Sequence, residues 1–156
     1  MKKINWKFYR PYRDKLVDKK NEVLSRIFDK KKKDINLLSS EINRVLFLRT
    51  DGKIGDYIIS SFIFREIKKN YPNIKIDVIA DKSLKKLLKL NKNIDNCYII
   101  NRKHMSDWRA VSKKLKKNDY TVLFDSTEGL KYKQVYLLNR VNAKINVGYN
   151  KDDYKI

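Results

Sequence analysis

The stretch from Arg44 to Asn70 constrains the fold more strongly than any other part of this chain. It opens with an apolar run from Val45 to Leu48, which has the length and the flanking residues of a buried strand. A polar segment from Thr50 to Asp56 follows, and its glycines predict a sharp turn because glycine adopts backbone angles that other residues resist. A helix is predicted after the turn, because apolar residues recur there at helical spacing, at Ile58, Ile59, Phe62, Ile63 and Ile67.

Strands and helices continue to alternate through the rest of the chain. Between the second and third strands, Asp81 or Ser83 can cap a short helix whose apolar face is Leu84, Leu87 and Leu88. The order predicts right-handed crossovers and an α/β fold over residues 44–156, in which a parallel sheet carries helices on both faces. Further strands are predicted at 74–80, 97–100, 120–124 and 145–147, and further helices at 106–117 and 131–141.

Residues 1–43 form a basic extension ahead of this domain. Between Tyr12 and Phe28, apolar residues fall on one side of a predicted helix, and its other sides are rich in Lys and Arg. A basic amphipathic helix of this kind can lie in a membrane interface, and the run from Lys30 to Lys33 would strengthen its attraction to anionic lipid. It can equally pack on the globular domain or be partly disordered. The sequence leaves peripheral membrane contact through this extension as one of these alternatives.

The formal net charge of +20, from 38 Lys and Arg against 18 Asp and Glu, favours anionic partners. The lysines are scattered through every segment, however, and the signatures of RNA- and DNA-binding folds are absent from the sequence. We therefore interpret the excess as a solvated surface and expect no specific nucleic-acid partner.

Signals of cellular location and redox chemistry are few. No apolar run approaches the roughly 18–20 residues that span a bilayer, and the amino terminus lacks the apolar middle of a secretory signal. A cytoplasmic location is the expectation, at the inner face of the cytoplasmic membrane if the basic extension binds lipid. Cys97 is the only cysteine, which excludes an internal disulfide, and we expect it to be a small buried side chain.

The loops after the first and fourth strands should lie together, because the carboxyl ends of parallel strands meet at one edge of the sheet. That edge would gather carboxylates, hydroxyls and amines, and ligands bind there in open α/β folds. The first loop contributes Thr50, Asp51, Gly52, Lys53, Gly55 and Asp56, and the fourth contributes Asp125, Ser126, Thr127, Glu128 and Lys131.

Asp56 stands out among these residues because it places a carboxylate at the mouth of the predicted cleft. It could accept a proton from a hydroxyl group as that group attacks an electrophile, which is the work of a general base. It could also cap the amides at the start of the helix, where a negative charge suits the dipole, and spacing alone favours this structural role. Gly52 and Gly55 could likewise admit a ligand or merely permit the turn, and on their own they favour the turn.

Other motifs are absent or weak. The first loop contains neither the GxGxxG fingerprint of dinucleotide-binding folds nor a P-loop. Asp125 and Glu128 are more typical of loop caps than of catalysts. His104 is the only histidine, and we expect an exposed loop residue, because a lone histidine provides neither a metal cluster nor a catalytic triad.

Two separated segments resemble glycosyltransferase family 9, the ADP-heptose:lipopolysaccharide heptosyltransferases and their relatives. The run RVLFLRTDGKIGDYIISSFIFREIKKNYPNIKIDVIA is similar to the family's opening strand, its Arg or Lys, its loop ending in Gly-Asp, and the helix that leads to a tyrosine-proline turn. The run DYTVLFDSTEGLKYKQVYLLNRVNAKINVGYN resembles its fourth strand, Asp-containing loop, next helix and next strand. The likeness covers about residues 44–150 in colinear order.

The resemblance implies that residues 44–156 are the acceptor-side, amino-terminal lobe of a GT-B type glycosyltransferase, which has two Rossmann-like domains with a cleft between them. Such enzymes transfer a sugar with inversion and without a metal or other cofactor, from a nucleotide-sugar such as ADP-heptose to a lipid-linked saccharide. The aspartate of the Gly-Asp motif, the base that activates the acceptor hydroxyl, falls on Asp56. The resemblance places the acceptor pocket among Thr50, Asp51, Gly52, Lys53, Gly55, Asp125, Ser126, Glu128 and Lys131.

The sequence also departs from the family pattern. Where many members carry a proline in the first helix, this chain has Phe62 or a neighbour, and the loop around Asp51, Gly52 and Lys53 indicates a subgroup with a different acceptor. The chain reaches Ile156 before any segment that resembles the donor lobe, which we therefore expect on missing residues or on a separate chain. Two alternatives remain, namely a non-catalytic basic α/β module that binds nucleic acid or an anionic polymer, and an inactive fragment.

Overall fold

The computed structural model of this protein describes residues 41–127 and 131–148, together with the single positions Pro11, Lys15, Asp18, Lys19 and Val23. Apart from such single positions, the predicted basic helix between Tyr12 and Phe28 lies outside the described residues, as does Glu128.

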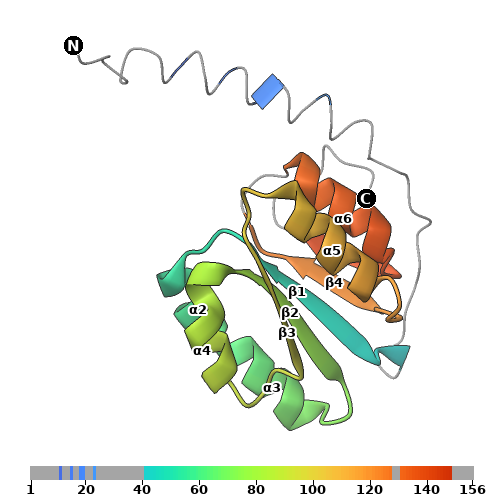
Figure 1. The fold of residues 1–156 in the computed structure, drawn as a ribbon. Coiled ribbons are helices and arrows are strands. Elements are labelled where there is room, and N and C mark those ends of the chain that lie inside the picture. The colour runs from blue at the N-terminus through green and yellow to red at the C-terminus, as the bar shows by residue number, and fades with distance from the viewer. Residues whose placement is uncertain are drawn as a thin grey trace.

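Strands and helices alternate in the described part of the chain, as the sequence predicts (Figure 1). Their bounds are β1 Arg44–Arg49, α2 Ile54–Ser60, α3 Phe62–Asn70, β2 Lys75–Asp81, the 3-10 turn η2 Lys82–Leu84, α4 Lys85–Leu90, β3 Asn96–Ile100, α5 Met105–Leu115, β4 Val122–Asp125, α6 Tyr132–Val141 and β5 Ile145–Gly148.

The strands form one parallel sheet of five, in the order β3-β2-β1-β4-β5. β1 is central, and its register pairs Phe47 with Val78 of β2 on one side and with Phe124 of β4 on the other. β2 and β3 are added in turn on one side of β1, and β4 and β5 are then added in turn on its other side. The neighbouring ends of β1 and β4 are therefore the switch point of the sheet, where folds of this kind bind ligands.

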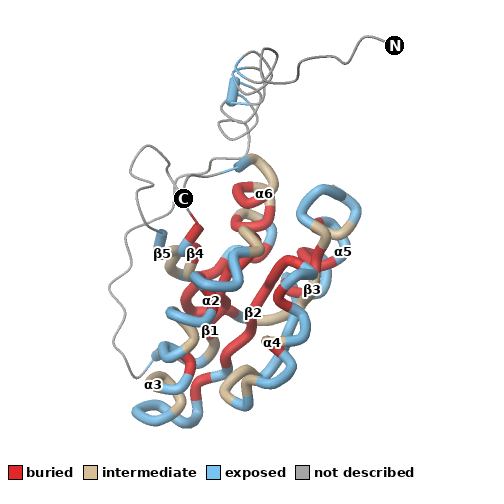
Figure 2. The backbone as a smooth tube through the Cα atoms, turned by 90° about the vertical axis from the view of Figure 1, so that its left-hand side faces the viewer, coloured by how far each residue is buried: buried red, intermediate tan, exposed pale blue. Residues whose placement is uncertain are grey.

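The core consists of two apolar layers, one on each face of the sheet, which are the buried segments in Figure 2. Helices α5 and α6 cover one face, where Leu46, Leu123 and Trp108 are buried. Helices α2, α3 and α4 cover the other, where Phe47 and Phe64 pack edge to face with ring centroids 4.9 Å apart. The predicted α/β class, with a parallel sheet and helices on both faces, is confirmed.

The first helical segment differs from its sequence pattern in two ways. It begins at Ile54, before Asp56, and Ser61 separates it into α2 and α3. Most of the apolar side chains whose spacing indicated the helix face solvent, with exposed fractions of 58% for Ile58 and 75% for Ile59. The helix packs on the sheet through Tyr57 and Phe64 instead.

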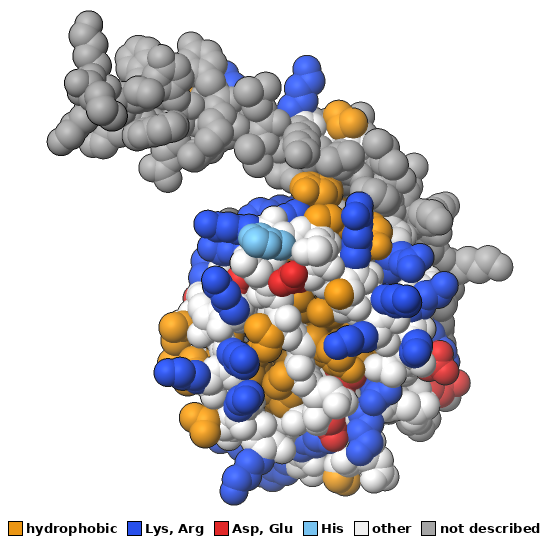
Figure 3. All heavy atoms as spheres, viewed as in Figure 1, with side chains coloured by type: hydrophobic (Ala, Val, Ile, Leu, Met, Phe, Trp, Pro, Cys, Tyr) orange, Lys and Arg blue, Asp and Glu red, His pale blue; other side chains and the backbone are white. Residues whose placement is uncertain are grey.

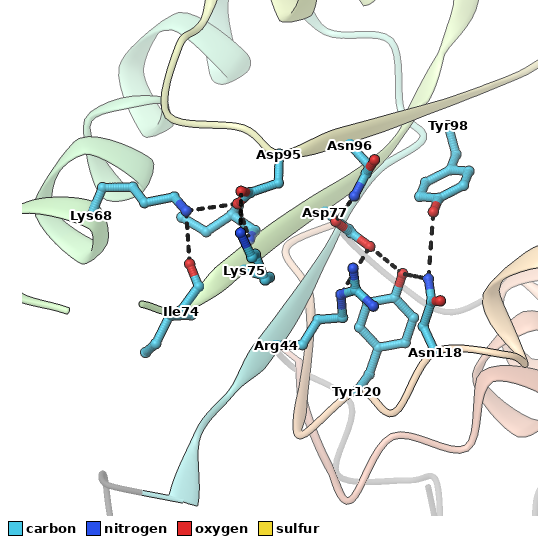
Figure 4. A network of polar contacts seen from close by, with 11 residues as sticks. Arg44, Lys68, Ile74, Lys75, Asp77, Asp95, Asn96, Tyr98, Asn118 and Tyr120 are labelled. Carbon is cyan, nitrogen blue, oxygen red and sulfur yellow. Dashed lines mark hydrogen bonds and ion pairs between the residues drawn. The ribbon is translucent and has the colours of Figure 1, made fainter. Parts of the chain in front are cut away.

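A polar network ties the strands together at the amino edge of the sheet, opposite the switch point (Figure 4). Asp77 is fully buried, and its carboxylate accepts hydrogen bonds from the Tyr120 hydroxyl at 2.5 Å and from Asn96 Nδ2 at 2.8 Å. Arg44 Nε lies 3.5 Å from the same carboxylate. Burial, together with the hydrogen bond to Asp77, raises the pKa of Tyr120, so the phenol remains a donor.

The structure confirms the predicted cap at Asp81 but not the predicted burial of Cys97. The Asp81 side chain accepts a hydrogen bond from Ser83 N–H at 3.0 Å, which confirms it as the cap of the short helical turn before α4. Cys97 is exposed, so the expectation of a buried thiol was wrong. It lies near the start of β3, which is an edge strand and is covered by a neighbour on one side only. No helix in the described ranges is long and apolar enough to span a membrane.

Candidate functional site

The switch point of the sheet is flanked by cavities on its two faces. The chain directs alternate residues to them, because successive side chains of an extended segment face opposite sides. At the end of β1, Arg49 lines the cavity on the α2–α3 side and Thr50 lines the cavity on the α5–α6 side. At the end of β4, Ser126 lines the first cavity and Thr127 lines the second. Asp125 also borders the first cavity, although its carboxylate accepts hydrogen bonds from Thr127 on the other side.

The cavity on the α5–α6 side has a volume of about 500 Å³, which is ample for a small-molecule ligand. A buried glutamine organises one wall, because Gln134 Nε2 donates to Thr127 Oγ1 at 2.6 Å and to Thr50 Oγ1 at 3.5 Å. The Gln134 amide oxygen accepts the Lys131 N–H at 2.8 Å, which fixes the start of α6. The lining residues are Thr50, Asp51, Lys53, Arg102, Trp108, Thr127, Lys131, Tyr132, Lys133 and Gln134.

Cationic side chains make this cavity suited to an anionic or phosphorylated ligand. Arg102 Nη1 donates to the Asp51 carbonyl at 2.6 Å, which connects the loop after β3 to the loop after β1. Lys133 Nζ donates to the carbonyls of Arg102 and Lys103 at 3.1 and 2.7 Å. Elsewhere, Lys and Arg side chains are spread over the face seen in Figure 3 and do not form a single band, as expected for a solvated surface.

Asp56 lies in the first turn of α2 and contacts a lining residue of each cavity. Its carboxylate is 3.6 Å from Lys53 Nζ, and its backbone carbonyl accepts a hydrogen bond from Ser60 Oγ at 2.6 Å. The side chain is 53% exposed. The residue at the helix start is Lys53, and no side chain caps it, so the capping of amides that spacing favoured for Asp56 is wrong. The carboxylate does lie in the first turn, where a negative charge suits the helix dipole.

The glycines of the first loop have different roles. Gly52 has a φ of +74°, a left-handed conformation that other residues adopt only with strain, so the turn requires it. Its carbonyl accepts a hydrogen bond from Ser83 Oγ at 3.2 Å. Gly55 lies inside α2 with ordinary helical geometry, and a Cβ atom added there would meet nothing within 4 Å. The turn thus explains Gly52 but not Gly55.

The fourth loop divides between the two cavities. Asp125 is 3% exposed, and its Oδ1 accepts the Thr127 N–H at 3.1 Å and the Thr127 hydroxyl at 2.6 Å. This is the loop-capping geometry that its position predicted. Ser126 accepts a hydrogen bond from Arg49 Nη1 at 2.6 Å, whereas Glu128 lies outside the described residues. The predicted residues of one rim thus lie on both faces of the sheet.

The sequence reasoning missed Arg49 and the lining residues contributed by the loop after β3, α5 and α6, of which Arg102 and Lys133 are charged and Gln134 is buried. Arg102 follows β3, whose carboxyl end lies on the same rim, so the topology rule already used for β1 and β4 would have found it. Trp108 and Gln134 carry no such signal, because helical spacing assigns them to a core face. His104 is exposed, as predicted, and occupies the position before α5.

Titration and metal binding add little at this rim. Burial raises the pKa of Tyr57, the residue through which α2 packs on the sheet, so this phenol stays protonated near neutral pH. Within 41–127 and 131–148, no group of three or more His, Cys, Asp and Glu side chains is placed to hold a metal ion.

Comparison with known proteins identifies the fold through structures alone. No protein-family model matches this chain, and no curated protein matches its sequence. A glycosyl transferase family 9 structure from Veillonella parvula DSM 2008 matches with a TM-score of 0.61 and 17% identity, over 73% of this chain and 34% of that one. The ADP-heptose LPS heptosyltransferase II of E. coli matches with a TM-score of 0.57 and 16% identity, over 70% and 31%.

A further match is the E. coli heptosyltransferase WaaC with ADP, with a TM-score of 0.58 and 16% identity, over 72% of this chain and 36% of that one. This chain therefore spans about a third of the length of the solved structures that it matches. At these identities the likeness establishes the fold: the described domain is a Rossmann-like unit of the kind found within glycosyltransferases of family 9.

Proposed function

We propose that this chain supplies the acceptor-side lobe of an inverting glycosyltransferase related to the lipopolysaccharide heptosyltransferases. The shared fold and the two colinear sequence segments support the relationship. The observation that carries the proposal is the position of Asp56 in the first turn after β1, where its exposed carboxylate lies 3.6 Å from Lys53 of the cation-lined cavity and does not cap the helix.

Asp56 acts as the general base in this proposal. Its carboxylate takes the proton of an acceptor hydroxyl while that oxygen forms a bond to the anomeric carbon of the donor sugar. The bond between the anomeric carbon and the diphosphate breaks at the same time, so the configuration inverts and a nucleoside diphosphate leaves. The Lys53 ammonium, 3.6 Å from Asp56, offsets the negative charge of the carboxylate before the proton arrives.

The cavity on the α5–α6 side holds the acceptor. Its lysines and Arg102 suit a saccharide that carries phosphates or acidic sugars, and Thr50, Asp51 and Thr127 offer hydrogen-bonding groups for sugar hydroxyls. The acceptor is a lipid-linked saccharide at the cytoplasmic face of the membrane, and the donor is a nucleotide-sugar of the ADP-heptose type bound by a second lobe. The solved structures that support this donor and acceptor are the ADP-heptose LPS heptosyltransferase II and the heptosyltransferase WaaC with ADP, both from E. coli.

Sugar transfer by the Asp56→Asn variant tests the proposal directly. The chain is assayed alone and joined to any coding sequence that continues past Ile156, with a panel of nucleotide-sugars and lipid-linked acceptors. Loss of the base should lower kcat by about 10²–10⁴-fold while the thermal unfolding midpoint stays close to that of the wild type. The control is Glu66→Gln, which removes an exposed carboxylate on α3 away from the rim and should retain activity.

Three outcomes would contradict the proposal in different ways. Full activity of Asp56→Asn would remove Asp56 as the base. Absence of transfer in every form, with tight and salt-sensitive binding to nucleic acid, would favour the basic binding module. Absence of both transfer and binding would favour an inactive fragment.

A further inference from the structure

The cavity on the α2–α3 face of the sheet is separate from the proposed acceptor cavity. It has a volume of about 340 Å³, near the lower end of the range for small-molecule sites. It lies between α3 and the carboxyl halves of β1, β4 and β5. Its apolar lining consists of Phe47, Ile63, Phe64, Phe124 and Val147, and its polar lining includes Arg49, Ser60, Asp125 and Ser126.

Arg49 is the unusual member of this lining, because it is a charged residue that is only 5% exposed. Its Nη1 donates to Ser126 Oγ at 2.6 Å. Its Nε and Nη2 are buried and have no hydrogen-bond partner in the described part of the chain. Buried donors without partners are costly, so a guanidinium with an unused edge points to an acceptor that binds from outside the chain.

The unused edge of Arg49 determines the chemistry of that acceptor. The Nε–H and one Nη2–H lie side by side in the guanidinium plane, and their spacing matches the two oxygens of a carboxylate or phosphate. Asp125 lines the same cavity and offsets part of the positive field of Arg49. Charge alone would therefore hold an anion weakly here, and the two aligned hydrogen bonds are needed as well.

The apolar lining determines the rest of the ligand. The rings of Phe47 and Phe124 are stacked with centroids 5.0 Å apart, and Phe64 packs edge to face on Phe47. Ile63 and Val147 are 38% and 41% exposed, so the apolar wall continues to the surface. A ligand that binds Arg49 and fills this wall must join an oxyanion to an apolar group.

We propose that this cavity is a binding site for a small amphiphile, with its oxyanion on the Nε–Nη2 edge of Arg49 and its apolar chain along the phenylalanine wall. The site lies on the opposite face of the sheet from the cation-lined cavity, and its occupation does not require sugar transfer. It therefore stands or falls independently of Asp56 as a base.

Isothermal titration of the full chain with octyl phosphate, below its micelle concentration, tests the site. Octyl phosphate should bind at least about tenfold more tightly than inorganic phosphate, which lacks the chain, and octyl glucoside, which lacks the charge. Arg49→Met should remove the preference for octyl phosphate over octyl glucoside. The matched control is Arg109→Met, which removes an exposed positive charge on α5 and should leave that preference intact.

Two further arms separate the sources of the oxyanion and guard against a misfolded variant. Vesicles that contain phosphatidic acid should compete with octyl phosphate if the ligand is a membrane lipid, and should not compete if it is a soluble amphiphile. Arg49→Lys keeps the charge without the paired donors and should bind octyl phosphate more weakly. In the wild type, the Arg49 Nε–H resonance should shift during the titration.

The proposal is overturned by equal binding of octyl phosphate and octyl glucoside to the wild type. Unchanged octyl phosphate binding in folded Arg49→Met would also overturn it, because Arg49 would then serve only to hold Ser126. If neither Arg49 variant folds, an Arg49 Nε–H resonance that does not move during titration of the wild type overturns it as well.

Discussion

Gly52 and Gly55 lie in one short segment, yet their backbones make opposite predictions for replacement by alanine. Gly52→Ala should destabilise the fold by about 1–2 kcal/mol, because its φ of +74° strains any side chain and the new Cβ would lie 3.0 Å from Ser83 Oγ. Gly55→Ala should stabilise it by up to about 1 kcal/mol, because alanine favours the helix and the added Cβ meets open space. Urea unfolding of the two variants and the wild type measures both changes.

The two glycine variants control for each other, since each adds one methyl group to the same segment. Equal destabilisation would contradict the difference in conformation, and would mean that the space over Gly55 is filled when the protein folds in solution. A neutral Gly52→Ala would show that the turn can relax to a negative φ.

At single residues, the sequence predicts position better than role. Its pattern places Asp56 at the junction between β1 and the helix that follows, because only the order of strand, turn and helix is needed for that. It does not predict whether the carboxylate caps the helix, because a shift of the helix start to Ile54 moves Asp56 from the cap into the first turn. Arg49 illustrates the same limit, since nothing local indicates that a residue at the end of β1 is buried with unused donors.

Asp95 fastens α3 to the β2–β3 part of the sheet. Its Oδ2 accepts hydrogen bonds from the Lys68 ammonium and from the Ile76 N–H, each at 2.7 Å. Lys75 Nζ lies 3.5 Å from Oδ1. Partial burial by itself would raise the pKa of Asp95, because it disfavours the charged carboxylate. The hydrogen bonds from Ile76 and Lys68 and the positive charges of Lys68 and Lys75 have the larger effect, so the pKa is lowered. Asp95→Asn should therefore cost about 1–2 kcal/mol at pH 7.

The pKa shift of Asp95 predicts how this cost varies with pH. A lowered pKa in the folded state means that the ionised carboxylate stabilises the fold above the unfolded pKa of about 3.9, and that this stabilisation is lost as the pH falls through the folded value. The gap in unfolding free energy between the wild type and Asp95→Asn should thus be full at pH 5–7 and should shrink below about pH 4. Asp119→Asn, at an exposed position, is the control, and a gap that is constant with pH would contradict the linkage.

At the level of elements, periodicity predicts that a helix exists but does not always identify its buried face. The apolar spacing after Asp56 predicts α2 and α3, yet Ile58, Ile59 and Phe62 are exposed, and Tyr57 and Phe64 are buried. The reason is that apolar residues lie on more than one side of these helices, so the sheet selects between two faces. By contrast, α5 has a narrow apolar face, and there Trp108, Val111 and Leu115 are buried as their spacing predicts.

The whole fold was the most predictable level, because alternation of strands and helices leaves few topologies. The gathering of loops at one edge follows from that order alone, whereas the central position of β1 is known only from the structure. The division of this edge into two cavities could not be predicted, because it depends on which side each residue faces once a strand has ended. A shift of one residue would exchange Arg49 and Thr50 between the cavities.

The net charge of +20 acts on the molecule as a whole. Self-repulsion destabilises a compact cationic chain, and salt screens it, since the Debye length falls from about 30 Å at 0.01 M to about 3 Å at 1 M ionic strength. The thermal unfolding midpoint should therefore rise by a few degrees, roughly 2–8 °C, between 0.01 and 0.5 M sodium chloride.

A double variant with Lys82→Glu and Lys86→Glu, both exposed near the start of α4, lowers the charge and should unfold at a higher temperature in low salt. It should also respond less to salt than the wild type, whereas an equal response would show that salt acts on the protein through specific ion binding and not through its net charge.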